Sequence, residues 1–375
     1  MIRIPSATRA RSACRTRTYA PPPGTIGGQR LDTLSPRNVP GAAPDAMAPN
    51  VPLFPPKPPL AHGLLDVGDG HRLHFERCGN PDGLPVLFLH GGPGSGCSPR
   101  HRQFFDPARF HVVLFDQRGC GRSTPRGGCH ANTTRELVED IERLRLHLGI
   151  ERWLVFGGSW GAALAVAWCG ANPDRCLGAI LRGSFLTGQA DLDWFFGPEG
   201  AGAICTEAWS TLCAAVPEAA EGRALAALCA ALAGTDARAA ARAAQAWAAW
   251  EEAVIAPARP APPPPARDAE ALGALIDKYR VQAHYLAHRC FLGEDAVLEA
   301  ARRMAGIPTA LLHGRLDLVC RARNAQRLHQ ALPGSRLRLI DGAGHNPFEP
   351  EMARALMGAL EHFALQGDFR RWPAG

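Results

Sequence analysis

Short apolar runs alternate with helix-like stretches along most of the chain, and this alternation is interrupted once. The strand-like runs 85–90 and 153–156 flank residues 133–148, which have helical periodicity. Residues 200–300 are instead rich in alanine and helix-like, with few strand signals, and strand-like runs return at 309–313. Alternating strands and helices form a parallel sheet covered by helices, so we predict an α/β fold with a helical insertion.

Other segments complete this prediction. Residues 64–79 alternate as a strand pair does, around the turn signal Gly68-Asp69-Gly70. Further strands are expected at 111–116, 176–181 and 336–340, and further helices at 161–169 and 351–365.

The composition excludes two broad classes of protein. No apolar run reaches the ~18 residues of a membrane span, so no membrane partner is expected. The net charge is +6, but residues 1–50 hold seven arginines against two aspartates, so the remainder is close to +1. A chain with so little excess charge on its folded part carries no basic field of the size that nucleic acid requires. Oligomeric state has no signature in the sequence.

The twelve cysteines are scattered and form no C-x-x-C pair. In a chain of this length we interpret them as free thiols in a reducing compartment, which favours a cytoplasmic protein. Only two lysines occur, Lys57 and Lys278, and we attribute their scarcity to codon bias.

The first residues have a composition of their own. Residues 1–56 are rich in Arg, Ser, Thr and Pro and have no apolar core of a signal peptide, so we predict a disordered extension. Two explanations stay open, an organelle transit peptide or an upstream start with Met47 as the initiator. The proline-rich run 260–265 is expected to be a loop between helices.

A nucleophile motif lies between a predicted strand and a predicted helix. Gly157-Gly158-Ser159-Trp160-Gly161 fits G-x-S-x-G in the strand–turn–helix setting that this motif requires. Small flanking residues permit a tight turn that lifts the Ser159 hydroxyl above the sheet. We therefore predict Ser159 as a catalytic nucleophile, against the alternative of a structural glycine-rich turn.

Such a serine needs backbone N–H donors for the oxyanion. One should come from Trp160, the residue after the nucleophile. The second should come from the loop His90-Gly91-Gly92-Pro93-Gly94, where we favour the N–H of Gly92. His90 is expected to support this loop.

A carboxylate and an imidazole follow later strands, in the order Ser, Asp, His. Asp317 ends the segment HGRLD after strand 309–313, and His345 ends DGAGH after strand 336–340. We predict that Asp317 orients His345 and that His345 takes the proton of Ser159. Among the competitors, His313 is expected to be buried and Asp341 to form a turn.

Two further candidates are given structural roles. Asp116 is expected to pair with Arg118 or Arg122. His284 and His288 have the spacing of zinc ligands, but no third ligand accompanies them, so no metal or other cofactor is predicted.

At this point the chain resembles a known family. The segments HGGPG, DQRGCGRS, GGSWG, LRGSFL, DLDWFF, AWAAWEE, HGRLDLVC and AGHNPFEP occur in the order found in prolyl aminopeptidases (proline iminopeptidases) of the α/β-hydrolase superfamily. The resemblance covers residues 57 to 366. It implies an α/β-hydrolase core at 57–186 and 304–370, a helical cap at 187–303, and a catalytic triad of Ser159, Asp317 and His345. It also implies a small peptide substrate with a free N-terminus.

The cap departs from the family pattern. Two cap glutamates of the family hold the substrate ammonium; Glu251 matches the first, and Gln282 stands in place of the second. Leu286 replaces an aromatic residue of the proline pocket and Phe196 a tyrosine, whereas Phe185 is retained. The resemblance implies that these five residues bind substrate, and the replacements predict weaker or altered selectivity for proline.

We therefore predict a serine peptidase that releases an N-terminal residue, preferentially proline, through an acyl-enzyme. The first alternative is an esterase, lactonase or amidase on the same scaffold, favoured by Gln282 and Leu286. The second is a binding protein without catalysis, which the complete Ser, Asp and His set disfavours.

Overall fold

The computed structural model describes residues 53–257 and 267–373. Most of the predicted disordered extension (1–56) and the whole predicted loop at 260–265 lie outside the described residues. The described part contains an eight-stranded sheet with strand order β1-β2-β4-β3-β5-β6-β7-β8. The strands are β1 (Ala61–Gly68), β2 (His71–Gly79), β3 (Leu84–Leu89), β4 (Phe110–Phe115), β5 (Trp153–Gly158), β6 (Cys176–Arg182), β7 (Thr309–Gly314) and β8 (Arg336–Ile340).

The sheet is parallel except at one edge. β2 runs antiparallel to both β1 and β4, and all other neighbouring pairs are parallel. The turn between β1 and β2 uses Gly68, Asp69 and Gly70, all with positive φ. Glycine adopts this backbone conformation readily, which is why the sequence signals a turn there. The predicted strand pair and the predicted α/β fold are confirmed.

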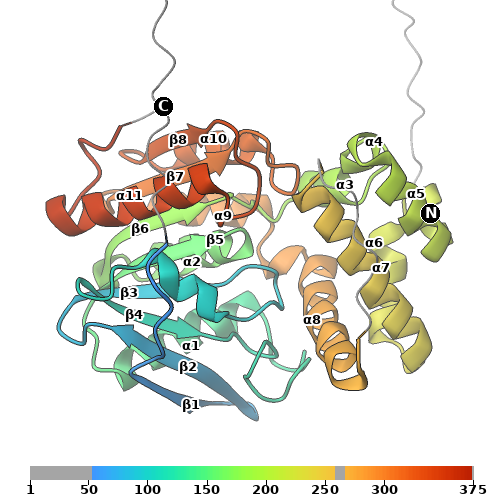
Figure 1. Ribbon diagram of the computed structural model, residues 1–375, viewed down its shortest axis with the longest axis horizontal. Coiled ribbons are helices and arrows are strands. Elements are labelled where there is room, and N and C mark those ends of the chain that lie inside the picture. Colours follow the sequence, from blue (N-terminus) through green and yellow to red (C-terminus); the bar gives the residue numbers. More distant parts are fainter. Residues whose placement is uncertain (1–52, 258–266, 374–375) are drawn as a thin grey trace, which may run out of the picture. The chain divides into compact units, whose positions relative to one another are not determined.

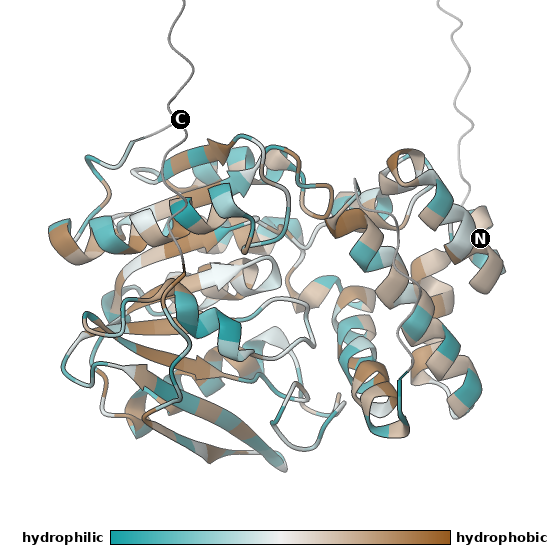
Figure 2. Cartoon of the chain, in the orientation of Figure 1, coloured by the Kyte–Doolittle hydropathy of each residue, from teal (hydrophilic) through white to brown (hydrophobic). Residues whose placement is uncertain are grey.

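The two faces of the sheet bury two apolar clusters. In β5, Trp153 and Val155 point into one cluster, and Leu154 and Phe156 into the other. Successive side chains of a strand point to opposite faces, so this continuous apolar run is buried on both sides. In Figure 2 the middle strands accordingly carry much of the brown, hydrophobic colour.

Helices cover both faces of the sheet, namely α1 (Thr134–His147), α2 (Trp160–Ala171), α9 (Gly293–Arg303), α10 (Ala322–Ala331) and α11 (Pro350–Gln366). α2 packs on β5 and β6 and carries α1 and α9 beside it, whereas α11 packs on β6, β7 and β8 from the other face. α1 begins after Thr133, which forms a capping box with Glu136.

The remaining helices are grouped on one side of the sheet (Figure 1). They are α3 (Gln189–Phe195), α4 (Ala201–Ile204), α5 (Thr206–Ala215), α6 (Ala224–Ala233), α7 (Ala237–Ile255) and α8 (Ala269–Ala287). α5, α6, α7 and α8 pack on one another, whereas α9 packs on α2 and α10 beside the sheet. The helical insertion is thus present, and its exact limits at 187 and 303 stay a prediction.

Candidate active site

Ser159 occupies a strained turn between β5 and α2. Its φ and ψ are 57° and −124°, a region that non-glycine residues rarely adopt. The flanking glycines permit this turn: a Cβ on Gly157 would lie 2.3 Å from the Gly161 oxygen, and one on Gly161 would lie 2.1 Å from the Leu89 oxygen. The turn therefore depends on the residue types that the motif prescribes.

His345 and Asp317 meet at the carboxyl ends of β8 and β7. His345 Nδ1 lies 2.7 Å from Asp317 Oδ2. The other carboxylate oxygen, Oδ1, accepts the backbone N–H groups of Val319 and Cys320 at 2.9 and 2.8 Å. With both oxygens occupied, Asp317 holds one orientation and can fix the imidazole with its proton on Nδ1.

Burial alone would raise the pKa of Asp317. The charge and hydrogen bond of His345, together with His313 and the Cys320 N–H, outweigh burial and hold the pKa of this carboxyl below its usual value. Asp317 is therefore charged, as a residue that stabilises an imidazolium must be.

Arg182 connects the segments of Ser159 and His345. Its backbone oxygen accepts the N–H of Ser159 (2.9 Å), and its Nη1 donates to the His345 oxygen (2.8 Å) and lies 3.4 Å from His345 Nε2. The side chain is buried, and burial lowers the pKa of the guanidinium although Asp317 opposes this. Arg182 was not among the site residues predicted from the sequence. Its place at the end of a parallel strand, where such folds build sites, was the available signal.

Ser159 and His345 line the same cavity, of about 250 Å³. The hydrogen bonds of residues 53–257 and 267–373 include none between Ser159 Oγ and His345 Nε2, and in substrate-free enzymes this contact is often loose. Cys320 also lines this cavity. Burial, followed by the charge of Asp317, raises the pKa of the Cys320 thiol well above its usual value, so this thiol is neutral.

The glycine-rich loop after β3 lies against the serine. A Cβ on Gly91 would lie 3.4 Å from the Cβ of Ser159, and Gly92, with φ of 112°, also lines the cavity. His90 is buried under the loop and accepts the Gln117 N–H at Nε2 (3.1 Å). Donation of oxyanion hydrogen bonds by Gly92 and Trp160 stays a prediction that this close approach supports.

All five predicted substrate-binding residues line this cavity. They are Phe185, Phe196, Glu251, Gln282 and Leu286. Phe185 follows β6, and the others come from the C-terminal end of α3, from α7 and from α8. The fold thus brings the cap residues and the predicted nucleophile into one enclosure. Residues of the lining that the sequence did not suggest include His101, Asp191, Phe195, Ile255 and Phe348.

Glu251 is held by three donors from α8. Tyr279 OH donates to Oε2 at 3.0 Å, Gln282 Nε2 donates to Oε2 at 3.4 Å, and Lys278 Nζ lies 3.4 Å from Oε1. Burial, and next the charge of Glu251, raise the pKa of Tyr279 well above its usual value, so the phenol keeps the proton that it donates. Neither Lys278 nor Tyr279 was among the site residues predicted from the sequence.

The expected structural roles of Asp116 and His313 are seen in the contacts. Asp116 is buried and pairs with Arg122 (2.8 Å from Nε), not with Arg118. His313 is buried and its Nε2 lies 2.7 Å from the Cys320 oxygen.

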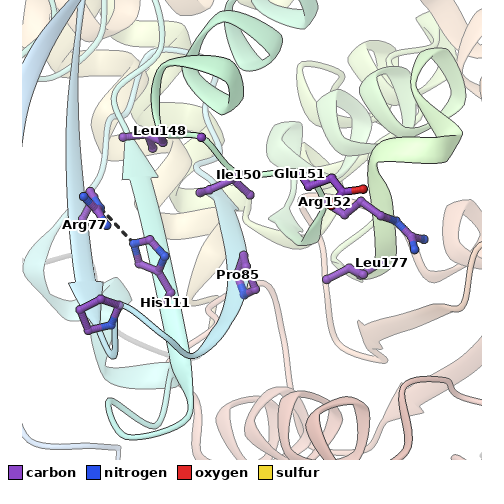
Figure 3. Close-up of a pocket in the computed structure, with 10 residues that line it drawn as sticks. Arg77, Pro85, His111, Leu148, Ile150, Glu151, Arg152 and Leu177 are labelled. Atoms are coloured by element: carbon purple, nitrogen blue, oxygen red, sulfur yellow. Dashed lines mark hydrogen bonds between the residues drawn. The ribbon is translucent and has the colours of Figure 1, made fainter.

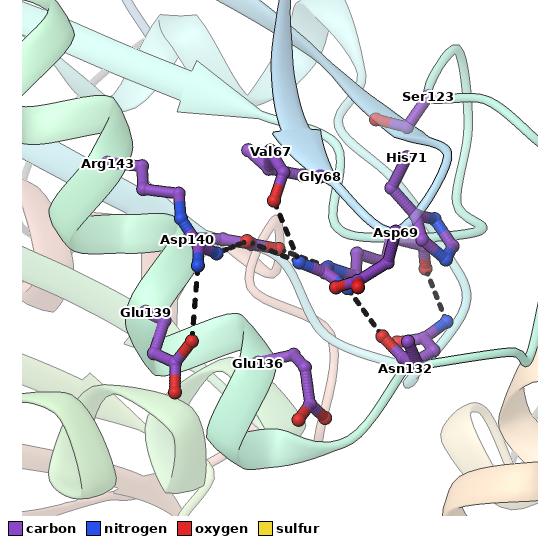
Figure 4. A network of polar contacts seen from close by, with 12 residues as sticks. Val67, Gly68, Asp69, His71, Ser123, Asn132, Glu136, Glu139, Asp140 and Arg143 are labelled. Atoms are coloured by element: carbon purple, nitrogen blue, oxygen red, sulfur yellow. Dashed lines mark hydrogen bonds and ion pairs between the residues drawn. The ribbon is translucent and has the colours of Figure 1, made fainter.

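Arg118 belongs to a separate buried network. Its Nε donates to Asp140 (2.6 Å) and its Nη1 to Asp69 (3.0 Å). Asp69 and Asp140 thus both contact the Arg118 guanidinium, and Figure 4 shows Arg143 next to Asp140. This network joins the β1–β2 turn to α1 and has a structural role.

A larger cavity, of about 540 Å³, lies elsewhere (Figure 3). Its lining includes Pro85, His111 and Leu177, from the amino ends of β3, β4 and β6, and none of the predicted site residues. Ligands of open α/β sheets bind at the carboxyl ends of the strands, so we do not assign the substrate to this cavity.

Two features of the described residues bear on metals and membranes. No three His, Cys, Asp or Glu side chains within residues 53–257 and 267–373 are grouped so as to hold a metal ion. Of the helices in these same ranges, none combines the length and the apolarity needed to cross a membrane.

Comparisons with known proteins agree with the fold and the motifs. The α/β-hydrolase fold family matches residues 85–351, so the chain is an α/β hydrolase. A proline iminopeptidase of Xylella fastidiosa (strain Temecula1) is 42% identical over 312 residues, which cover 83% of this chain and 99% of that protein. One of Arabidopsis thaliana is 40% identical over 317 residues, covering 84% and 83%. The chain belongs to the proline iminopeptidase family, and the resemblance seen in its motifs is confirmed.

Solved structures share the fold at lower identity. A proline iminopeptidase from Mycobacterium smegmatis superimposes with a TM-score of 0.55 at 21% identity, covering 83% of this chain and all (100%) of that chain. A putative lipase of Acinetobacter baumannii gives 0.54 at 15% identity, covering 82% and 91%. The predicted α/β-hydrolase fold is therefore confirmed.

Proposed function

We propose that the chain is a serine aminopeptidase that releases N-terminal proline from small peptides. The observation that carries this proposal is that one cavity is lined by Ser159 and His345 and also by Glu251. A carboxylate in the same enclosure as a nucleophile can hold the ammonium of a substrate whose first carbonyl faces that nucleophile. The names of the relatives support proline as the released residue.

The reaction follows two acyl-transfer steps. His345 accepts the proton of Ser159 as the hydroxyl attacks the carbonyl of the first residue, and the oxyanion forms against the N–H groups of Gly92 and Trp160. His345 then gives the proton to the departing amine. Water, deprotonated by His345, hydrolyses the acyl-enzyme and releases proline.

Substrate selection is assigned to four cap residues and to Phe185 of the core. Glu251 and Gln282 bind the free N-terminus, and Phe185, Phe196 and Leu286 surround the pyrrolidine ring. A blocked N-terminus adds a group for which the enclosure of about 250 Å³ has little room, and it removes the charge that Glu251 pairs with.

The test compares proline β-naphthylamide with its N-acetyl form. Cleavage of the first and not of the second is expected. Equal turnover of the two substrates would remove the aminopeptidase proposal and leave the triad proposal intact.

A second candidate is an esterase or amidase that acts on neutral substrates. It is favoured by Gln282, which carries no charge, and by Lys278, whose charge offsets that of Glu251. Turnover of neutral esters without turnover of any aminoacyl anilide would favour this candidate. We also propose a cytoplasmic location, which the eleven free cysteines of the described residues support.

A further inference from the structure

Glu251 already has a cation beside it. Lys278 Nζ lies 3.4 Å from Glu251 Oε1, and the two side chains are 27% and 18% exposed. Of the two residues, only Glu251 lines the cavity, so the ammonium of Lys278 reaches the carboxylate from outside the space that a substrate would fill. The cap therefore holds a neutral pair, and not a free carboxylate, next to the cavity.

Gln282 adds an acceptor without adding charge. Its Nε2 donates to Glu251 Oε2 at 3.4 Å, which fixes the orientation of the amide because a flipped amide would place oxygen against oxygen. Its Oε1 is buried and has no hydrogen-bond partner among the described residues, and Gln282 lines the cavity with 5% exposure. A buried acceptor without a partner is costly, so Oε1 is ready for an N–H donor from a ligand.

The backbone that carries Lys278 is fixed against the loop next to Ser159. A Cβ on Gly94 would lie only 2.3 Å from the Lys278 oxygen and 3.4 Å from the Gln282 nitrogen. This close packing of α8 on the loop leaves the Lys278 backbone little freedom to move away. Lys278 and Gln282 are one helical turn apart, so both reach Glu251 from the same face of α8.

We propose that Lys278 is a specificity-determining residue that competes with the substrate's N-terminal cation for Glu251. This inference rests on the proposed role of Glu251 in substrate binding. The ammonium of a substrate shares a carboxylate that is already paired, and it donates a second hydrogen bond to the neutral acceptor Gln282 Oε1. Cationic substrates are therefore bound more weakly than the carboxylate alone would allow, whereas neutral substrates are unaffected by Lys278.

The test uses Lys278→Met, which keeps the aliphatic stem and removes the charge. Binding of a cationic ligand is measured as the inhibition constant of L-prolinamide against hydrolysis of p-nitrophenyl acetate, an ester without an ammonium. The variant should lower this constant about three- to fivefold, the effect of removing one partly exposed competing charge. The KM of proline β-naphthylamide should fall by the same factor as the inhibition constant. The kcat and the KM measured with the ester should not change.

Two variants serve as controls, and a third can replace the test variant. Lys278→Arg keeps the charge and should leave the inhibition constant unchanged. Arg280→Met removes a different cation from α8, one that pairs with Asp277 at 3.5 Å and does not line the cavity, and should also have no effect. Lys278→Gln is a second neutral variant, for use if the methionine variant does not fold.

An unchanged or increased inhibition constant in the neutral variants would overturn the inference, because Lys278 would then merely orient Glu251. The same result from Arg280→Met as from Lys278→Met would also overturn it. A wild-type protein that hydrolyses the ester and not the prolyl substrate would instead refute the proposed peptidase function. The two failures are therefore distinguishable.

Discussion

Asp317 Oδ2 lies 2.7 Å from His345 Nδ1, and this contact joins the loops that follow two neighbouring parallel strands, β7 and β8. Both residues are buried, with 4% and 8% of their surface exposed. Since Asp317 also accepts two backbone N–H groups, it acts as a fixed acceptor that orients the imidazole for Ser159.

Replacement of Asp317 by Asn should lower kcat roughly 10³- to 10⁴-fold with little change in KM. The Asn oxygen can still accept the Val319 and Cys320 N–H groups, which turns the amide NH₂ toward His345 Nδ1. The proton of the imidazole then moves to Nε2, which can no longer act as a base. The matched control is Asp341→Asn, at an exposed carboxylate that pairs with Arg315. Equal activity of the two variants would contradict the role of Asp317.

Replacement of Gln282 by Glu should raise kcat/KM for proline β-naphthylamide roughly ten- to a hundredfold. A second carboxylate beside Glu251 adds a charge-assisted hydrogen bond to the substrate ammonium, worth about 1.5–3 kcal/mol when desolvated. Gln282→Met, which removes both polar groups of the amide, should lower the same ratio. No gain with Glu would indicate that Gln282 does not face the N-terminus of the substrate.

Replacement of Gly94 by Ala should destabilise the protein by roughly 3 kcal/mol or more. The residue has φ of 95°, and a Cβ would lie 2.3 Å from the Lys278 oxygen, so α8 would have to move off the loop. Gly149→Ala is the matched control, because Gly149 also has positive φ (66°) and has nothing within 4 Å of a Cβ. That variant should cost about 1 kcal/mol. Urea unfolding measures the free energy of unfolding of both variants. Equal losses of this free energy would show that the contact of Gly94 with α8 is unimportant.

Acidification should destabilise the protein in part through His101. This ring stacks on Phe88 with centroids 4.6 Å apart, and burial, with a smaller contribution from His90 and Arg182, lowers its pKa from 6.5 to about 4. Between these pH values the unfolded chain binds a proton that the folded protein does not. The stabilisation is therefore present above pH 6.5 and is lost as the pH falls toward 4.

The shifted pKa of His101 lowers the free energy of unfolding by about 2 kcal/mol between pH 7 and pH 5. His101→Gln should lose less stability than the wild type over this interval in urea unfolding, and His130→Gln, at an exposed histidine, should lose as much as the wild type. If His101→Gln lost as much stability as the wild type over this interval, His101 would not be the group responsible for the acid sensitivity.

Much of the core follows from local sequence patterns. The buried strands β3, β4 and β5 are continuous apolar runs, because both their faces are covered, and polar or glycine-rich segments end them. Asp317 and His345 could be predicted because the carboxyl ends of parallel strands meet at one edge of the sheet. The orientation of the individual cap helices could not be predicted. The sequence of α6, for example, is ALAALCAALA, which has no polar face to show which side is buried.

Contacts between side chains that lie far apart along the chain could not be predicted from the sequence. Asp116 had two candidate partners, and only the fold selects Arg122, because Arg118 is turned toward Asp140 and Asp69. The sequence offered no role for Lys278, yet the packing of α7 on α8 brings it to Glu251. Periodicity assigns a residue to a face of its own helix and carries no information about the charge that faces it across an interface.

The role of Ser159 as the nucleophile is tested most directly by the turnover of proline β-naphthylamide by Ser159→Ala beside the wild type. We expect cleavage by the wild type and a loss of kcat/KM of roughly 10⁵-fold or more in the variant, with the fold unchanged by circular dichroism. A Ser159→Ala protein that retains a substantial part of the wild-type rate would contradict this role, because another group would then have to be the nucleophile.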